Sequence, residues 1–501
     1  MKKLKLAENR VEGGFFLHNG QQPQPLVWPE DKGQRVRFLG TYRGSGSPVR
    51  DSLVSMIRGA TKRVFVASFM LGDEEIIREM LAAAERLRGG VYLITALDEK
   101  SLRRGLEEYE ESEHTAPEER RKNFERLTSG GVYVRGHEEC HAKFAVVDDT
   151  VAIVGSANFV TNGLEWTNEA DVLIRDPDQV RQVAGLFIEL WYGGCTWEIP
   201  PGMKYIVSER AVAESPVRPA TSQTPPTRFV WTNGRGQTML LDAIREVADS
   251  AKQELTLATY SVAGMRKEPS LIFDHLHRAV KRGVRVRLLV RQRNAWPDQM
   301  SDLLVAADMG VAIHGDLRNH AKVIIADRDV GVVFSANLDA AHGLTSGVEA
   351  GIRVDDSDAI KALSEYVEHV ISNADAAFFR NPTVGELDGQ LAARWCGKWP
   401  YSQRLVVHAD RAARTAFTKE ASSGPCLFEQ QGDNKICLYA GSTAIVLAGP
   451  TDESSMHCES LTQCTPATER LRDWLVSVRR DQGNVSAKRG FCPAEISMPA
   501  S

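Results

Sequence analysis

Short apolar runs alternate along this chain with segments of helical spacing, the pattern of a mixed α/β fold. Apolar runs typical of buried strands occupy residues 63–70, 90–97, 131–135, 144–147, 151–154 and 170–174, and helical spacing occupies 52–59, 73–88 and 178–191. The same order returns later, with strands expected at 254–260, 284–290 and 311–314 and helices at 237–250, 269–281 and 297–309. Matching order predicts a duplicated α/β unit rather than two unrelated domains.

The length of 501 residues predicts two to four domains, because one ordinary hydrophobic core does not serve so long a chain. We expect a polar N-terminal arm over 1–30, a first α/β unit over 31–207 and a second over 228–380. A linker rich in Pro, Ser and Thr occupies 208–227. The pattern of apolar and polar residues changes beyond residue 380. We expect residues 381–501 to form a β-leaning appendage whose role the sequence does not indicate.

One long stretch occurs twice and dominates the chain. It reads HAKFAVVDDTVAIVGSAN from His141 to Asn158 and HAKVIIADRDVGVVFSAN from His320 to Asn337. Each copy has His-x-Lys, four residues, an Asp, seven further residues, a Ser, and an Asn two positions later. No packing requirement demands this spacing twice, so the paired set indicates a functional site.

The repeated residues offer the chemistry of a phosphate site. A histidine can act as nucleophile or general acid–base near neutral pH, so His141 and His320 are the catalytic candidates. Side chains alternate along a strand, so each lysine, Lys143 and Lys322, points to the side of its histidine. Serine and asparagine add hydrogen-bond donors for phosphate oxygens. These phosphate-binding candidates are Ser156, Asn158, Ser335 and Asn337.

Supporting roles follow for four carboxylates, and no metal ion is expected. Asp148 and Asp327 stand at the turn between two short strands, where we expect them to accept backbone hydrogen bonds. Glu169 and Glu349 each precede an apolar strand and could hold the histidine rings in the right tautomer. If the motif residues of the two units face each other, the two histidines can reach one phosphorus atom. One histidine attacks while the other protonates the departing oxygen and later activates water.

The two motifs resemble the signature of the phospholipase D superfamily, two copies of H-x-K-x4-D followed by G-S-x-N. The resemblance covers about residues 35 to 375 and departs at Phe334, where the family usually has Gly and where we expect a narrower wall beside Ser335. It implies two pseudo-symmetric α/β/α units around one metal-independent phosphodiesterase site that reacts through a covalent phosphohistidine, without a cofactor. It also implies that His141 is the nucleophile and His320 the general acid and base. Because both copies stand in one chain, a monomer suffices for one complete site.

Composition bears on where the protein works. A net charge of −5 gives the whole chain no attraction to anionic partners, and no apolar run is long enough to span a bilayer. The chain begins without a secretory signal, and its eight cysteines form no CxxC pair, so we expect reduced thiols and a cytosolic location. His457, Cys458 and Cys464 could serve zinc, but buried thiols are the preferred interpretation.

The resemblance implies a phosphodiester substrate, and three hypotheses for the function stay open. An intracellular nuclease is favoured, because residues 275–297 hold seven Arg or Lys and no acidic residue. Its candidate phosphate contacts are Arg285, Arg287, Arg291 and Arg293. A soluble phospholipase D or phosphatidyl transferase would need an exposed apolar rim, with Trp191, Trp197, Trp231 and Trp296 as candidates. The third hypothesis is a catalytically idle binding module, against which the completeness of both motifs counts.

Overall fold

The computed structural model describes most of the chain up to residue 382 and short strands beyond it. The described residues are 14–18, 23–88, 90–96, 117–199, 202, 208–213, 228–233, 237–292, 297–340, 343–382, 403–407, 427–430, 435–440, 443–448 and 485–489. They fall into two compact units. One comprises 24–291 and 318–372 and holds both motif copies; the other comprises 1–23, 292–317 and 373–501. The first predicted repeat lies in the motif-bearing unit from residue 31 on, whereas 292–317 and 373–380 of the second predicted repeat fall in the other unit.

The first sheet of the motif-bearing unit is built around the hairpin of the first motif. Its strands lie in the order β10 (Ser208–Glu209), β9 (Trp197–Ile199), β5 (Tyr133–Gly136), β4 (Val91–Thr95), β3 (Val64–Ala67), β6 (Lys143–Val147), β7 (Val151–Gly155), β8 (Glu169–Ile174) and β2 (Val36–Thr41). β3, β4 and β5 are parallel to one another, whereas β6, β7, β8 and β2 follow as antiparallel neighbours.

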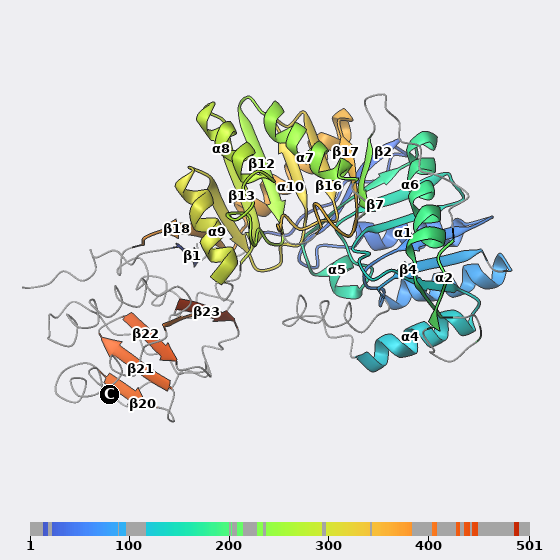
Figure 1. Cartoon of the computed structure of the whole chain (residues 1–501), viewed down its shortest axis with the longest axis horizontal. Coiled ribbons are helices and arrows are strands. Elements are labelled where there is room, and N and C mark those ends of the chain that lie inside the picture. Colours follow the sequence, from blue (N-terminus) through green and yellow to red (C-terminus); the bar gives the residue numbers. More distant parts are fainter. Residues whose placement is uncertain are drawn as a thin grey trace, which may run out of the picture. The chain divides into compact units, whose positions relative to one another are not determined.

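The second sheet repeats this arrangement with the second motif. Within the same unit its strands lie in the order β13 (Arg285–Arg291), β12 (Glu254–Thr259), β15 (Val323–Ala326), β16 (Val330–Phe334), β17 (Val348–Val354) and β11 (Phe229–Asn233). The parallel pair β12–β13 corresponds to β3–β4, and the antiparallel run corresponds to β6, β7, β8 and β2. The predicted duplicated α/β fold is thereby confirmed (Figure 1).

Helices cover the faces of both sheets, which makes each repeat a layered α/β/α unit. Those of the first repeat are α1 (Pro48–Gly59), α2 (Glu74–Arg86), α4 (Pro117–Ser129), α5 (Thr161–Glu165), α6 (Pro177–Glu189) and the π-helical turn η2 (Leu190–Gly194). Those of the second are α7 (Met239–Ser250), α8 (Phe273–Lys281) and α10 (Ser357–Ser372). Asp73 caps α2 and Asp176 caps α6 by accepting hydrogen bonds from backbone N–H groups of the first turn.

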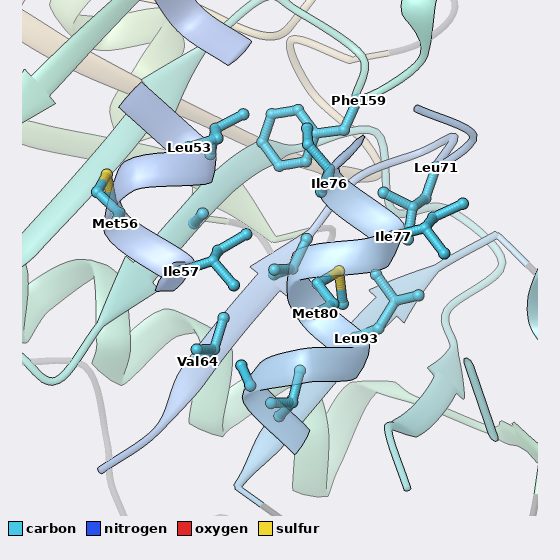
Figure 2. Close-up of a cluster of buried hydrophobic side chains, with 14 of the residues drawn as sticks. Leu53, Met56, Ile57, Val64, Leu71, Ile76, Ile77, Met80, Leu93 and Phe159 are labelled. Carbon is cyan, nitrogen blue, oxygen red and sulfur yellow. The ribbon is translucent and has the colours of Figure 1, made fainter. Parts of the chain in front are cut away.

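Strand alternation places one half of the core on each side of the first sheet. Val64 and Val66 of β3 face α1, α2 and α4 within one large apolar cluster. Figure 2 shows the side chains of this cluster, among them Leu53 and Ile57 of α1, Ile76 and Met80 of α2, and Leu93 of β4. On the other face Phe65 stacks on Phe187 of α6, with ring centroids 4.4 Å apart. The strands are consequently held rigidly from both sides.

The turns of the two motif hairpins share an unusual backbone conformation. Asp148 and Asp149 have φ of 53° and 55°, and Asp327 and Arg328 have φ of 52° and 59°. Two successive positive φ values are the mark of a type I′ turn, whose twist suits a tight hairpin. Aspartate tolerates this region better than most residues, which accounts for the residue type at Asp148 and Asp327.

The other compact unit contains two paired strands that the sequence analysis did not predict. Phe15, Phe16 and Leu17 are buried in β1 (Gly14–His18), which pairs with β18 (Ala376–Arg380), so part of the expected polar arm is a core strand. β14 (Ala312–Asp316) pairs with the other edge of β18, and α9 (Pro297–Asp308) belongs to this unit. The C-terminal region contributes a five-stranded sheet in the order β20 (Leu427–Gln430), β21 (Lys435–Ala440), β22 (Thr443–Ala448), β19 (Gln403–Val407) and β23 (Val485–Arg489).

Candidate active site

The motif residues of both repeats gather at one edge of each sheet. Lys143 opens β6, Ser156 and Asn158 follow the end of β7, and Glu169 opens β8. The second repeat places its residues alike, with Lys322 just before β15 and Glu349 near the start of β17. Because β6 and β7 form a hairpin, the start of one strand lies beside the end of the other. Each sheet therefore presents its histidine, lysine, asparagine and glutamate together.

The backbone connects the two motif copies directly. The N–H of His141 donates to the carbonyl of Val348 and the N–H of His320 to that of Asn168, both at 2.9 Å. Val348 and Asn168 are the residues immediately before Glu349 and Glu169. Cys140 forms a parallel bridge with Val348, and Asn319 forms one with Asn168. Each histidine is thereby anchored next to the glutamate of the opposite repeat.

The two histidine–glutamate pairs are crossed. His141 Nδ1 lies 2.8 Å from Glu349 Oε1, and His320 Nδ1 lies 2.6 Å from Glu169 Oε1. Both glutamates are almost completely buried, so each carboxylate needs its hydrogen-bond partners from the protein. A carboxylate acceptor at Nδ1 favours the tautomer with its proton on Nδ1, which leaves the lone pair of the ring on Nε2. The structure thus gives both glutamates the orienting contact that the sequence suggested, from the other half of the chain.

Each of the two motif serines makes hydrogen bonds with the glutamate of its own repeat. Ser156 Oγ donates to Glu169 Oε2 at 2.5 Å and accepts from the N–H of Ala170 at 3.0 Å. Ser335 Oγ donates to Glu349 Oε2 and accepts from the N–H of Ala350 in the same way. Both serines are fully buried. Their hydroxyls are engaged in holding the glutamates, which differs from the phosphate-binding role expected for Ser156 and Ser335.

The expected narrowing beside Ser335 is also absent from the geometry. Phe334 is fully buried and pairs with Gly351, and a Cβ at that glycine would lie 3.0 Å from the Cβ of Phe334. In the first repeat the glycine stands on the motif strand and the larger residue on the neighbouring strand, because Gly155 pairs with Asp171. A Cβ at Gly155 would meet the Asp171 carboxylate at 2.2 Å. Phe334 therefore fills the interior of the sheet and does not shape a substrate wall.

Burial acts differently on the two crossed pairs. Desolvation lowers the pKa of His320 well below its ordinary value, and the nearby Lys322, Lys143 and Arg291 lower it further. Desolvation also raises the pKa of Glu169 to about 7, against the opposing effect of Lys322 and Ser156. Burial would raise the pKa of Glu349 too, but His141, Lys143 and Ser335 outweigh it and lower that pKa. The His320–Glu169 pair thus carries a proton below about pH 7, while the lowered pKa of Glu349 favours its ionised form.

Two buried lysines stand beside the histidines. Lys322 Nζ lies 2.9 Å from both the Nε2 and the carbonyl oxygen of His320, and Lys143 Nζ donates to the carbonyl of His141. Neither lysine side chain is exposed to solvent. Asn158 and Asn337, which end the two motifs, are buried at the same sheet edge. Two ammonium groups enclosed in protein strongly favour an anionic ligand.

The two motif aspartates face away from the histidines. Asp148 accepts hydrogen bonds from the N–H groups of Thr61, Lys62 and Arg63, and Asp327 from those of Lys252, Gln253 and Glu254. Burial would raise their pKa, but these backbone donors lower the pKa of both carboxyls below the ordinary value. Both aspartates thus tie the hairpin turn to the start of the neighbouring strand.

Two aromatic residues near the histidines were not anticipated, and they are joined by Arg291, which was expected as a phosphate contact. Phe69 packs edge-on against the ring of His141 and Tyr260 against that of His320, with centroids 5.3 Å apart in each case. Arg291 lies over the Tyr260 ring at 5.8 Å and is almost fully buried. The two aromatic residues could have been found from the sequence. Phe69 comes just after β3, and Tyr260 comes just after β12, the corresponding strand of the second repeat.

The basic segment expected to follow a nucleic-acid backbone is largely neutralised. Arg285 pairs with Glu254 at 2.6 Å, Arg287 with Glu368 at 2.9 Å, and Arg278 with Asp249 at 3.3 Å. Arg293 lies outside the described residues. Of this segment, Arg291 alone among the four candidate contacts is both described and placed beside the catalytic histidines. In the described part of the segment, Arg278, Arg285 and Arg287 are therefore paired with carboxylates and do not form the free basic surface that was expected.

The tryptophans proposed for a membrane rim are mostly inside the fold. Trp231 is fully buried, Trp191 is 8% exposed, and Trp197 is partly buried against the apolar core. Trp296 lies outside the described residues, as do His457, Cys458 and Cys464. Among the residues that the structure describes, no cluster of His, Cys, Asp or Glu has the arrangement of a metal site. Within the same residues, no helix has the length and apolar character needed to cross a bilayer.

Comparison with known proteins agrees with this geometry. The family model described as "Cardiolipin synthase, PLD-like domain" matches residues 53–191 and 244–371, which include both motifs. The 5'-3' exonuclease PLD3 of Homo sapiens is 25% identical over 278 residues, which cover 51% of this chain and 53% of the relative. The same protein of Macaca fascicularis is 28% identical over 215 residues, covering 38% and 42%. The chain thus spans about half the length of these curated relatives.

A solved structure supports the fold alone. The phosphatidylserine synthase of Haemophilus influenzae superposes with a TM-score of 0.50 at 14% sequence identity, over 79% of this chain and 97% of the other. At that identity the likeness reflects the duplicated α/β architecture and says nothing of the substrate.

Proposed function

Because the chain belongs to the phospholipase D superfamily, within the cardiolipin synthase, PLD-like domain family, we propose that it is a metal-independent phosphodiesterase acting on nucleic acid. The crossed histidine pairs carry this proposal, since they give one site two oriented imidazoles and two buried ammonium groups. The relatives named as 5'-3' exonucleases support nucleic acid over phospholipid as the substrate. The burial of Trp191 and Trp231 removes two of the candidates for a membrane rim.

We propose that His141 is the nucleophile. Its side chain is 19% exposed against 9% for that of His320, so His141 is the more accessible of the two to a substrate. The Nε2 of His320 already lies 2.9 Å from the Nζ of Lys322. An attacking nitrogen needs its lone pair directed at phosphorus, which the contact at His320 opposes. This division agrees with the roles that the family resemblance implies.

The reaction then proceeds in two displacements. The Nε2 of His141 forms a bond to phosphorus as the bond to the leaving oxygen breaks, and the His320–Glu169 pair donates the proton to that oxygen. Water next attacks the phosphohistidine while His320 takes its proton, and the P–N bond breaks to free His141. Lys143, Lys322, Asn158 and Asn337 stabilise the charge on the nonbridging oxygens throughout. The chain supplies all these groups itself, so we propose a monomer as the active form.

The substrate class is tested by offering both alternatives to the same protein. A single-stranded oligonucleotide and phosphatidylcholine vesicles are incubated separately in EDTA with the wild-type chain, His141→Ala and His275→Ala. We expect cleavage of the oligonucleotide by the wild type and by His275→Ala, whose histidine pairs with Asp249 away from the motifs, but not by His141→Ala. Release of choline with intact oligonucleotide would point to a phospholipase. If neither substrate changes, a binding module without activity becomes the better interpretation.

The cytosolic location stays a prediction. It is supported by Cys140 and Cys195, which are buried free thiols among the described residues. Burial raises the pKa of Cys140 to about 12, so this thiol is inert at neutral pH although it precedes His141.

A further inference from the structure

A large exposed aromatic side chain lies at the sheet edge that carries the site. Trp166 directly follows α5 and is 47% exposed, whereas most other large apolar side chains of the described residues are buried. It stands three residues before Glu169, and an extended chain of three residues spans at most about 10 Å. An exposed tryptophan this near a catalytic carboxylate is available to a bound substrate.

The backbone after Trp166 leads directly to His320. Asn168, two residues on, donates its N–H to the carbonyl of Arg318 at 2.8 Å and accepts the N–H of His320 at 2.9 Å. Trp166 therefore belongs to the His320 side of the site, where the leaving group departs in the proposed reaction. The corresponding position of the second repeat, counted back from Glu349, is Ser346. The His141 side consequently lacks an equivalent ring at that position.

The loop after β2 fixes the tryptophan ring from one side. Thr41 at the end of β2 pairs with Glu169 at the start of β8, so this loop lies at the same sheet edge as the site. The ring lies against Gly44, where a Cβ would come within 2.7 Å of it. Gly44 has φ of +78° and donates its N–H to the carbonyl of Glu165 at 2.7 Å. A glycine is thus required here for the ring to pack, while nearly half of the side chain stays accessible.

A flat ring held on one side and open on the other suits a nucleobase. Stacking of a base on an aromatic side chain is a common means of holding single-stranded nucleic acid, and it tolerates any base. We propose that Trp166 stacks on the nucleobase that flanks the scissile phosphate on the His320 side. The proposal rests on the nuclease function proposed above and extends it, because it makes the substrate single-stranded. A paired base inside a duplex has both faces covered by its neighbours.

The test compares two substrates that differ only in their bases. One is a single-stranded oligonucleotide, and the other has the same length and phosphodiesters but abasic sugars. For Trp166→Ala we expect kcat/KM to fall about tenfold on the oligonucleotide, mainly through KM, and to stay within about twofold on the abasic strand. Trp166→Phe should restore most of the loss. Trp166→Leu keeps apolar contact with Gly44 but lacks a flat ring, and it should behave like Trp166→Ala if the role is stacking.

Tyr133→Ala is the matched control. Tyr133 is 39% exposed and opens β5, at the sheet edge opposite to the site, so its loss should leave both substrates unaffected. The inference is overturned if Trp166→Leu keeps wild-type kcat/KM on the oligonucleotide, or if it loses activity equally on both substrates. In either case the wild type still cuts nucleic acid and the proposed function survives. If the wild type cuts neither strand, the proposed function fails and the inference fails with it.

Discussion

His141 Nδ1 lies 2.8 Å from Glu349 Oε1, although 207 residues separate the two along the chain (between positions 141 and 349) and the nearer motif glutamate is Glu169. His320 and Glu169 show the reciprocal contact. The pairs form because the backbone before each glutamate is bonded to the backbone of the opposite histidine. The site is therefore a product of both repeats together.

The crossed pairs predict which step each glutamate supports. Glu349→Gln should slow formation of the phosphohistidine, since Glu349 orients the nucleophile His141. Glu169→Gln should slow its hydrolysis, since Glu169 serves the acid–base His320. The comparison uses a p-nitrophenyl phosphodiester, whose departing oxygen needs no proton, so that formation of the intermediate does not depend on this pair. We expect losses of about 10- to 100-fold in each step, typical for removal of an orienting carboxylate. Rapid-quench measurement with radiolabelled substrate should show the intermediate accumulating in Glu169→Gln only; accumulation in Glu349→Gln instead would refute the crossed arrangement as the working one.

The covalent intermediate itself can be located. In His320→Ala the leaving oxygen can still depart from an activated substrate such as a p-nitrophenyl phosphodiester, but water activation is lost. We expect a phosphoryl adduct on His141 by mass spectrometry of the digested protein. Glu165→Ala, which removes a partly exposed carboxylate bonded to Arg50, is the control that should turn over without trapping. An adduct on His320 in His141→Ala, with none in His320→Ala, would exchange the two roles.

The pH dependence should reflect the His320–Glu169 pair. Burial raises the pKa of Glu169 to about 7 and lowers that of His320. Above the higher pKa the pair has lost its proton, so kcat/KM for formation of the intermediate should decline as pH rises through about 7. In Glu169→Gln the proton depends on His320 alone, and the decline should move to lower pH. Stopped-flow rates from pH 4 to 9, a range chosen around these pKa values, check this; an unchanged alkaline limb would exclude Glu169 as its source.

Asp327 should contribute to stability rather than to chemistry. Asp327→Asn replaces a carboxylate that accepts three backbone hydrogen bonds, and we expect the free energy of unfolding to fall by about 2 kcal/mol at pH 7. The pKa of Asp327 is lowered in the folded protein, so its contribution is present above the ordinary value of 3.8 and lost as pH falls through the folded pKa. Urea unfolding should show the difference between wild type and variant shrinking below about pH 4.

Asp329→Asn provides the control, because Asp329 is exposed in the same turn and should change stability by less than about 0.5 kcal/mol. A variant Asp327→Asn as stable as Asp329→Asn would contradict the structural role.

The sequence predicted the repeated fold and its motif hairpins well, because periodicity and turn residues are local properties. It did not predict the crossing, since the choice between Glu169 and Glu349 as partner depends on how the two sheets meet. The alternation of side chains along a strand predicted that Ser156 and Asn158 point to the same side. Strand β7 ends at Gly155, however, so this alternation does not extend to Ser156 and Asn158. The strand β1 was missed because its partner β18 lies more than 300 residues away.

Charge patterns were the least reliable guide. The arginines of 275–297 looked like a free basic surface, but their carboxylate partners, such as Glu254 and Glu368, lie outside the segment. From the sequence, Phe334 was expected to narrow the site. The sequence did not show that Gly351, on a different strand, leaves room for the Phe334 side chain inside the sheet. Both errors come from interpreting one segment without the strands and helices that pack against it.

Because each histidine contacts the glutamate of the other repeat, the two copies in such a gene cannot diverge independently. After most duplications one copy is redundant and free to accumulate changes. Here damage to either copy removes one imidazole and also the carboxylate that orients the other, so neither copy is a spare. A protein carrying only one copy of this unit would have to associate with a second molecule to assemble the same pair of contacts.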